Sequence, residues 1–316
     1  MRSVAMLVAL LLFTGCVAPL TERLRAVDVE EPRWNVGDWW TYNVTSDLIG
    51  ASGDITVVVA EIVGDGYILG IPAQTREGEN AAAALLYHMP AIGPVHRDLS
   101  WDVHETRFEP AKWPLKDDLA WETTWISQSV HLTARQNGTR WTINNSGFEI
   151  DDGMRYELVY DPAVKWFTSF TRTGLDGVVR QSMTLVANGT GYNGTLRAPQ
   201  FIEVAFLESR TQGVMSGGLP AAPNPSFTPS PSATNLLVGC LAGGAPGQYR
   251  AELLSPAGGI CALDVTVPPG DTGVRAQVLE VDASEGQWQA RLAAIGQGSA
   301  TVEVLAWPEL NYTLGG

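Results

Sequence analysis

The sequence predicts an all-β protein with an N-terminal antiparallel curved sheet or half-barrel, a proline-rich linker and a C-terminal β-sandwich. Most segments alternate apolar and polar residues and are rich in β-branched and aromatic side chains, as half-buried strands are. Asn-Gly and Asp-Gly pairs separate several of these segments, which favours tight hairpins. Five prolines fall between residues 211 and 235, which indicates an extended connection.

The N-terminal residues have the layout of a secretory signal. Arg2 supplies a positive charge, and an apolar run from Val4 to Phe13 follows it. That run is about half of the roughly 20 residues that a spanning helix needs. We therefore predict a signal peptide over residues 1–15.

The segment from Phe13 to Cys16, Phe-Thr-Gly-Cys, resembles a prokaryotic lipobox. This resemblance implies cleavage before Cys16 and a lipid on that cysteine, with residues 16–32 as a polar tether. We expect a lipid-anchored protein on the extracytoplasmic face of the cell membrane. An ordinary signal with an incidental cysteine is the alternative.

The first folded domain is expected over residues 33–210. Hairpin turns are predicted at 64–66, 137–138 and 176–177, and one weak helical segment at Glu79–Tyr87. Successive hairpins imply an antiparallel meander. The predicted strands are Trp39–Thr45, Ile55–Val63, Trp121–Ile126, Val130–Ala134 and Trp166–Thr171.

The linker is predicted over residues 211–235 and the second domain over residues 236–316. This domain contains about seven short β-rich segments in roughly 80 residues, which is typical of an immunoglobulin-like sandwich. The clearest segments are Leu236–Cys240, Tyr249–Leu254, Cys261–Val267, Arg275–Val281, Gly286–Ala293 and Ala300–Ala306.

Three phrases in the first domain carry a family resemblance: Trp34–Tyr42, Arg107–Leu115 and Tyr160–Phe167. The first, Trp-Asn-Val-Gly-Asp-Trp-Trp-Thr-Tyr, resembles the opening strand of exported lipoproteins from archaea and some bacteria. Such proteins are similar to lipoprotein-carrier half-barrels, in which a curved sheet surrounds an apolar interior. The second domain resembles immunoglobulin-like or prepeptidase-type accessory sandwiches. These resemblances imply architecture and no catalytic residue.

Export changes what the cysteines and asparagines are expected to do. Cys240 and Cys261 are the two cysteines left after the anchor, and a disulfide between them would contribute about 3 kcal/mol. Two buried thiols are the alternative. Surface glycosylation is compatible with six Asn-x-Ser/Thr sequons, at Asn43, Asn137, Asn144, Asn188, Asn193 and Asn311.

The net charge disfavours two classes of partner. Twenty Lys and Arg against 34 Asp and Glu give −14 at pH 7. Nucleic acid requires clustered basic residues, and so does electrostatic binding to anionic lipid. We expect neither partner, and the sequence contains no phosphate-binding glycine motif and implies no cofactor.

Motifs for catalysis or metal binding are weak. No Gly-x-Ser-x-Gly elbow occurs. His88, His96 and His104 are eight residues apart, and Asp98, Asp102 and Glu105 lie near them in the sequence, but no close His pair places two metal ligands together. We therefore expect no catalytic residue and no metal site.

Tryptophan is the remaining feature, since nine of the eleven lie in the first domain. Adjacent residues on a strand face opposite sides, so one of Trp39 and Trp40 is expected outside the core. The candidates for an apolar binding groove are Trp39, Trp40, Trp121, Trp125 and Trp166. Cross-strand packing in the core is the alternative.

The function favoured by these patterns is a non-enzymatic surface lipoprotein that binds or carries an apolar ligand, which is a lipid, glycan or peptide. The alternatives are a metal-dependent or hydrolytic enzyme of the cell envelope, using the region of His88, His96 and His104, and a purely structural envelope protein.

Overall fold

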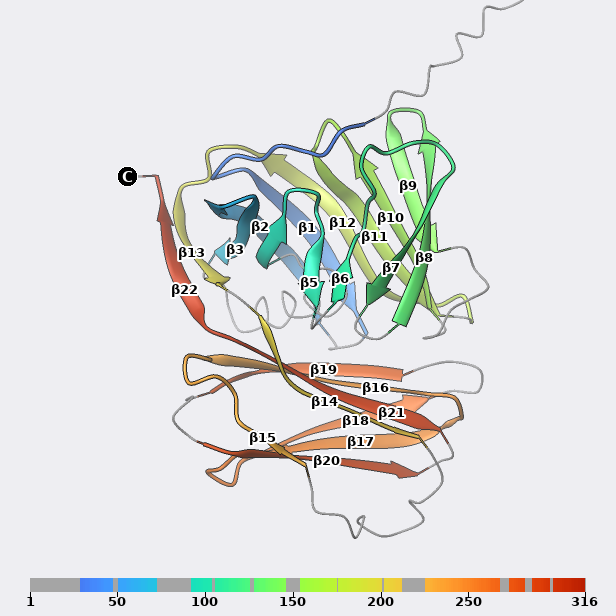
Figure 1. Cartoon of the computed structure of the whole chain (residues 1–316), viewed down its shortest axis with the longest axis vertical. Coiled ribbons are helices and arrows are strands. Elements are labelled where there is room, and N and C mark those ends of the chain that lie inside the picture. Colours follow the sequence, from blue (N-terminus) through green and yellow to red (C-terminus); the bar gives the residue numbers. More distant parts are fainter. Residues whose placement is uncertain are drawn as a thin grey trace, which may run out of the picture.

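A computed structural model gives the fold for residues 29–47, 51–72, 92–103, 106–125, 128–145, 154–174, 176–200, 202–211, 225–267, 273–281, 286–295 and 298–315. Every regular element in these ranges is a β-strand, so the predicted all-β class is confirmed. The signal peptide, Cys16 and the helical segment Glu79–Tyr87 lie outside the described residues. Figure 1 shows two bodies, a curved sheet above and a pair of packed sheets below.

The upper body, called the half-barrel here, is a curved sheet of twelve strands among the described residues. Its path begins at β22 and ends at β7, so the described strands do not close into a barrel. In spatial order the strands are β22 (Glu309–Leu314), β13 (Gly194–Pro199), β3 (Gly66–Pro72), β2 (Ala51–Val63), β1 (Trp39–Ser46), β12 (Val179–Gly189), β11 (Trp166–Gly174), β10 (Met154–Asp161), β9 (Arg140–Asn145), β8 (Gln128–Asn137) and β7 (Leu119–Trp125), with β4 (Gly93–His96) also paired to β3.

Glycine turns produce the meander where the sequence predicts them. Gly64, Gly138 and Gly177 have φ values of 57°, 64° and 78°, in the left-handed region that favours glycine. They join β2 to β3, β8 to β9 and β11 to β12. The three hairpin predictions are therefore confirmed. A separate small hairpin pairs β5 (Trp101–Val103) with β6 (Thr106–Phe108).

The lower body, called the sandwich here, contains two four-stranded sheets among the described residues. Its buried core includes residues from both sheets, such as Val238, Val304, Leu253 and Val265. The sheet nearer the half-barrel contains β14 (Glu203–Thr211), β21 (Ser299–Trp307), β16 (Asn235–Gly243) and β19 (Gly273–Glu280). The other contains β15 (Ser226–Phe227), β20 (Trp288–Ile295), β17 (Gly247–Leu254) and β18 (Ile260–Val267).

The domain boundaries predicted from sequence are wrong at three places. Strand β14 falls in the predicted first domain but pairs with β21 in the sandwich. Strand β22 falls in the predicted second domain but pairs with β13 in the half-barrel. Strand β15 falls in the predicted linker and pairs with β20. Strand pairing joins segments far apart in the chain, which composition along the sequence does not reveal.

The two bodies also share a core. The large hydrophobic cluster inside the half-barrel continues into the sandwich sheet that faces it, through Leu237, Ala276, Leu305 and Trp307. At the rim, the Arg275 guanidinium on β19 donates a hydrogen bond to the Asp47 carbonyl, over 2.7 Å. The half-barrel and the sandwich are therefore packed against each other through a shared hydrophobic core and are not independent domains.

Candidate functional site

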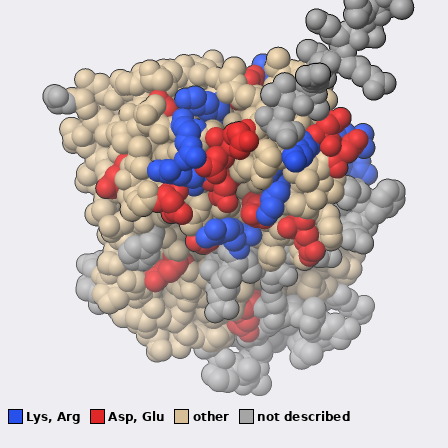
Figure 2. All heavy atoms as spheres, turned by 45° about the horizontal axis from the view of Figure 1, so that its top comes forward, with Lys and Arg blue, Asp and Glu red and all other residues tan. Residues whose placement is uncertain are grey.

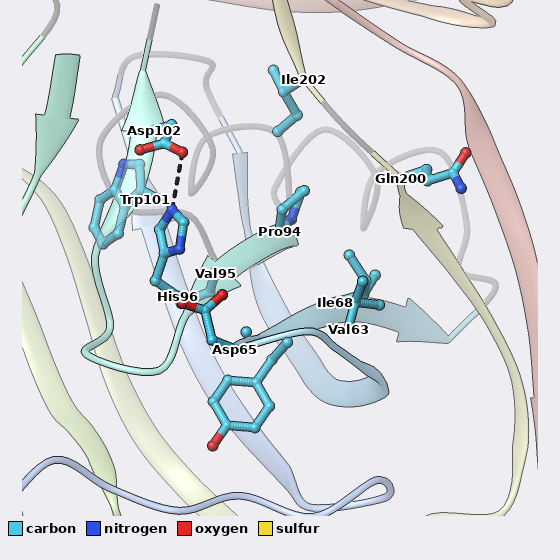
Figure 3. A pocket seen from close by; sticks show the side chains of 12 residues that line it. Val63, Asp65, Ile68, Pro94, Val95, His96, Trp101, Asp102, Gln200 and Ile202 are labelled. Carbon is cyan, nitrogen blue, oxygen red and sulfur yellow. Dashed lines mark hydrogen bonds and ion pairs between the residues drawn. The ribbon is translucent and has the colours of Figure 1, made fainter. Parts of the chain in front are cut away.

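A pocket of about 370 Å³ opens beside β3 and β4, where the chain crosses from the half-barrel to the sandwich (Figure 3). One wall comes from β3, β4 and β5, and the opposite wall comes from the crossing segment after β13. It is lined by Val63, Asp65, Gly66, Tyr67, Ile68, Pro94, Val95, His96, Trp101, Asp102, Gln200 and Ile202. An apolar lining with a few polar groups is typical of a small-molecule site.

A tight turn between β4 and β5 positions the polar groups of this pocket. The His96 amide donates to the Ser100 carbonyl over 2.8 Å, and the Leu99 amide donates to the His96 carbonyl over 3.0 Å. Asp98 Oδ1 accepts from the Ser100 amide over 2.9 Å. Leu99 has a φ of 66° although it is a fully buried leucine, which is a strained conformation held by its surroundings. The turn thus holds β4 and β5 side by side.

Three side chains form a hydrogen-bonded chain on this wall. His96 Nε2 lies 2.9 Å from Asp102 Oδ2, and Arg107 Nε donates to Asp102 Oδ1 over 2.9 Å. Asp102 and Arg107 are directly opposite each other in the β5–β6 hairpin. The imidazole is therefore held by a carboxylate that is itself held by a guanidinium.

The geometry also indicates which ring nitrogen carries the proton. Arg107 Nη2 is 3.1 Å from His96 Nε2, which cannot accept from Arg107 and donate to Asp102 at the same time. We assign Nε2–H as a donor to Asp102, because a bare lone pair at 2.9 Å from a carboxylate oxygen would be repelled. In the neutral ring this leaves Nδ1 as the basic nitrogen.

Asp102 and Arg107 stabilise each other's charged forms. Partial burial acts to raise the pKa of Asp102, but the hydrogen bonds and charges of His96 and Arg107 outweigh it, and the pKa is lowered. The hydrogen bond to Asp102 raises the pKa of Arg107. Asp102 therefore stays ionised at neutral pH and can hold the imidazole in one tautomer.

Of the three histidines considered in the sequence, only His96 is among the described residues. His96 lies on the pocket wall, whereas His88 and His104 lie outside the described residues. Within the ranges that the structure describes, no three His, Cys, Asp or Glu side chains are grouped closely enough to hold a metal ion. Sequence reasoning missed Arg107. The short separation of Asp102 and Arg107 in the sequence could have indicated their pairing, because it allows a tight hairpin in which the two residues lie opposite each other.

Most of the tryptophan candidates are core residues and do not form an open groove. Trp40, Trp121 and Trp166 are buried in the large cluster. Trp166 lies with its ring centroid 4.6 Å from that of Trp34. Trp39 is on the other face of β1, half-buried over a small separate cluster, as the alternation predicted. The side chain of Trp125 is outside the described part of the structure.

The expected disulfide is absent, because Cys240 and Cys261 are both free thiols. Cys240 is buried on β16 in one sheet, and Cys261 lies on β18 in the other sheet, where its thiol donates to Gln277 Oε1 over 3.5 Å. Five sequon asparagines are exposed, at Asn43, Asn137, Asn188, Asn193 and Asn311, and Asn144 is half-buried.

The end of the half-barrel away from the sandwich carries both signs of charge intermixed (Figure 2). Exposed ion pairs include Lys112 with Glu109 at 2.9 Å and Arg135 with Asp118 at 3.4 Å. Such pairs contribute little stability in water. The described residues contain no helix that is long and apolar enough to cross a membrane.

Comparison with known proteins gives limited similarity. No family model matches the chain, and no curated protein matches it. An exo-β-1,3-galactanase from Phanerochaete chrysosporium is 7% identical over 79% of this chain and 78% of its own, with a TM-score of 0.21. A family 43 arabinoxylan arabinofuranohydrolase from Bacillus subtilis is 9% identical over 85% of this chain and 79% of its own, with a TM-score of 0.19.

These solved structures are glycoside hydrolases, whereas the sequence led us to expect a non-enzymatic carrier of an apolar ligand. We withdraw that expectation, because the burial of Trp40, Trp121 and Trp166 removes the groove on which it depended. TM-scores near 0.2 transfer neither a reaction nor a substrate to this chain.

Proposed function

We propose that the chain is a hydrolase and that His96 acts as its general base in the pocket beside β4. The observation that supports this most directly is the 2.9 Å contact between His96 Nε2 and Asp102, on the wall of a pocket of about 370 Å³. An imidazole with one nitrogen held by a carboxylate keeps its other nitrogen available for a proton.

In the proposed reaction, His96 Nδ1 takes a proton from a water molecule as the water oxygen attacks an electrophilic carbon of the substrate. The bond from that carbon to the leaving group breaks, and the imidazolium returns the proton to the leaving group. Asp102 stabilises the imidazolium and fixes the tautomer. In Figure 3 the Asp65 carboxylate lies next to the His96 ring, where it can bind a polar group of the substrate.

The experiment is a screen of chromogenic esters and glycosides with the full chain, followed by His96→Gln and Asp102→Asn on any substrate that is turned over. We expect each substitution to lower kcat/KM by about 100-fold or more. His131→Gln is the matched control, because His131 forms an exposed pair with Glu122 at 3.9 Å, away from the pocket. Equal activity of the His96→Gln protein and the control would refute the proposal.

We also propose that the enzyme acts at the outer face of the cell membrane, held there by lipid on Cys16. The lipobox-like segment that ends at Cys16 supports this. Mass spectrometry of the N-terminal peptide from membrane-extracted protein would detect a diacylglycerol-sized addition that Cys16→Ala removes. An unmodified mature N-terminus would refute the anchor.

A further inference from the structure

Glu303 is a carboxyl buried between the half-barrel and the sandwich. On β21, Ala300, Val302, Val304 and Ala306 belong to the core of the sandwich. Leu305 and Trp307 belong instead to the large cluster of the half-barrel. Side chains alternate along a strand, so Glu303 shares the face of Leu305 and Trp307. This face is the one that packs against the half-barrel.

Among the described residues, the cross-strand neighbours of Glu303 are apolar and none of them compensates the charge of an ionised carboxylate. Glu303 is 2% exposed, and its Oε1 has no hydrogen-bond partner within the described structure. The residues opposite it are Leu207 on β14 and Gly239 on β16. An ionised carboxylate is very unfavourable in such a place, whereas the protonated acid is tolerated.

Among the described residues, no charged group on the neighbouring elements neutralises Glu303. Arg172 is buried on the inner side of the half-barrel, with its guanidinium 5.7 Å from the centre of the Tyr156 ring. Arg275 is directed to the Asp47 carbonyl at the rim. Burial raises the pKa of Glu303 from its ordinary value of 4.5 to about 7, and no charge of the described residues contributes to this shift.

We infer that the contact between the half-barrel and the sandwich is a pH-sensitive joint, tight while Glu303 is uncharged and loosened when its carboxylate forms. A raised carboxyl pKa means that the packed state holds the proton more tightly than the opened state does. The stability of the joint is therefore complete below about pH 4.5 and is lost as the pH rises through about 7. This inference is independent of the proposed hydrolase activity.

The test compares the full chain with Glu303→Gln at pH 5 and pH 8, by thermal unfolding and by small-angle X-ray scattering. We expect the Tm of the unaltered chain to fall from pH 5 to pH 8 by roughly 5 °C more than that of the variant. The radius of gyration should increase at pH 8 in the unaltered chain alone. Glu280→Gln, an exposed position on β19 of the same sheet, is the control and should behave as the unaltered chain does.

Glu303→Leu provides a second variant if the glutamine amide prevents folding, and it should show the same loss of pH dependence. Parallel Tm profiles for the unaltered chain and a folded Glu303 variant would overturn the inference. A Tm difference without any change in the radius of gyration would also overturn it, because ionisation would then destabilise the fold without loosening the joint.

Discussion

Gly37 is the residue that fixes how the chain enters the half-barrel. Its φ is 86°, and a Cβ at this position would lie 3.3 Å from the Tyr192 backbone nitrogen. The Gly37 amide donates to the Val59 carbonyl and its carbonyl accepts from the Tyr192 amide, both over 2.9 Å. The Gly-Asp-Trp-Trp phrase noted in the sequence therefore has a structural cause, because its glycine joins the start of β1 to two other segments.

We predict that Gly37→Ala lowers the free energy of unfolding by about 2–3 kcal/mol. The alanine would have to adopt the positive φ of Gly37, and its Cβ would lie close to the backbone of Tyr192. Gly138→Ala is the matched control, with a φ of 64° and open space around its Cβ. It should cost only about 1–2 kcal/mol. Denaturant unfolding measures both, and equal losses would show that the contact with Tyr192 is unimportant.

Strand β22 is the element whose location differs most from its place in the chain. It forms the edge of the half-barrel sheet and pairs with β13 from Gly194 to Pro199. Tyr312 and Leu314 help to cover Leu196 and Ala198, which are fully buried. The last described strand, β22, thus lies at the edge of the sheet that also contains β1.

We predict that a chain ending at Pro308 is less stable by about 3–5 kcal/mol, because the apolar residues under β22 become exposed. The loss should lower the Tm measured by near-ultraviolet circular dichroism, to which the tryptophans of the half-barrel contribute strongly. Asn311→Ala, at an exposed position on β22, should leave the Tm nearly unchanged. An unchanged Tm in the shortened chain would contradict the role of β22.

At the scale of the whole molecule, the shared hydrophobic core leads us to expect that the half-barrel and the sandwich unfold together. Trp307 is 4% exposed and belongs to the half-barrel cluster although its strand is in the sandwich. The covalent crossings at β13–β14 and β21–β22 lie beside each other, with the Gln200 amide donating to the Pro308 carbonyl over 3.4 Å. The same crossing contributes Gln200 and Ile202 to the pocket.

We predict that Trp307→Ala destabilises the chain by about 3–5 kcal/mol, which is the usual cost of removing a buried aromatic side chain. The unaltered chain should unfold in a single urea transition seen by both far- and near-ultraviolet circular dichroism. Ile260→Ala, at a position 62% exposed on β18, should cost little. Two separate transitions in the unaltered chain would argue against a shared core.

Local chemistry explains which parts of the fold were predictable. Alternation over residues such as Trp39–Thr45 and turn glycines such as Gly138 depend only on neighbours in the chain, and these strands and turns are where they were expected. The opposite facing of Trp39 and Trp40 follows from the same local rule. His96 could be noted as a candidate, but its spacing from the other histidines favoured no site.

The sequence by itself determined the all-β class, most strands, the hairpin turns and the existence of two β-rich bodies, because these follow from residues close together in the chain. Only the tertiary structure decided that β14 pairs in the sandwich and that β22 pairs in the half-barrel. It also decided that Trp166 lies in the core and that the buried Glu303 Oε1 has no hydrogen-bond partner among the described residues. The His96–Asp102–Arg107 arrangement also depends on the β4–β5 turn and the register of the β5–β6 hairpin. Pairing and burial are set by contacts between distant segments, which compete with one another across the whole molecule, and no local pattern specifies their outcome.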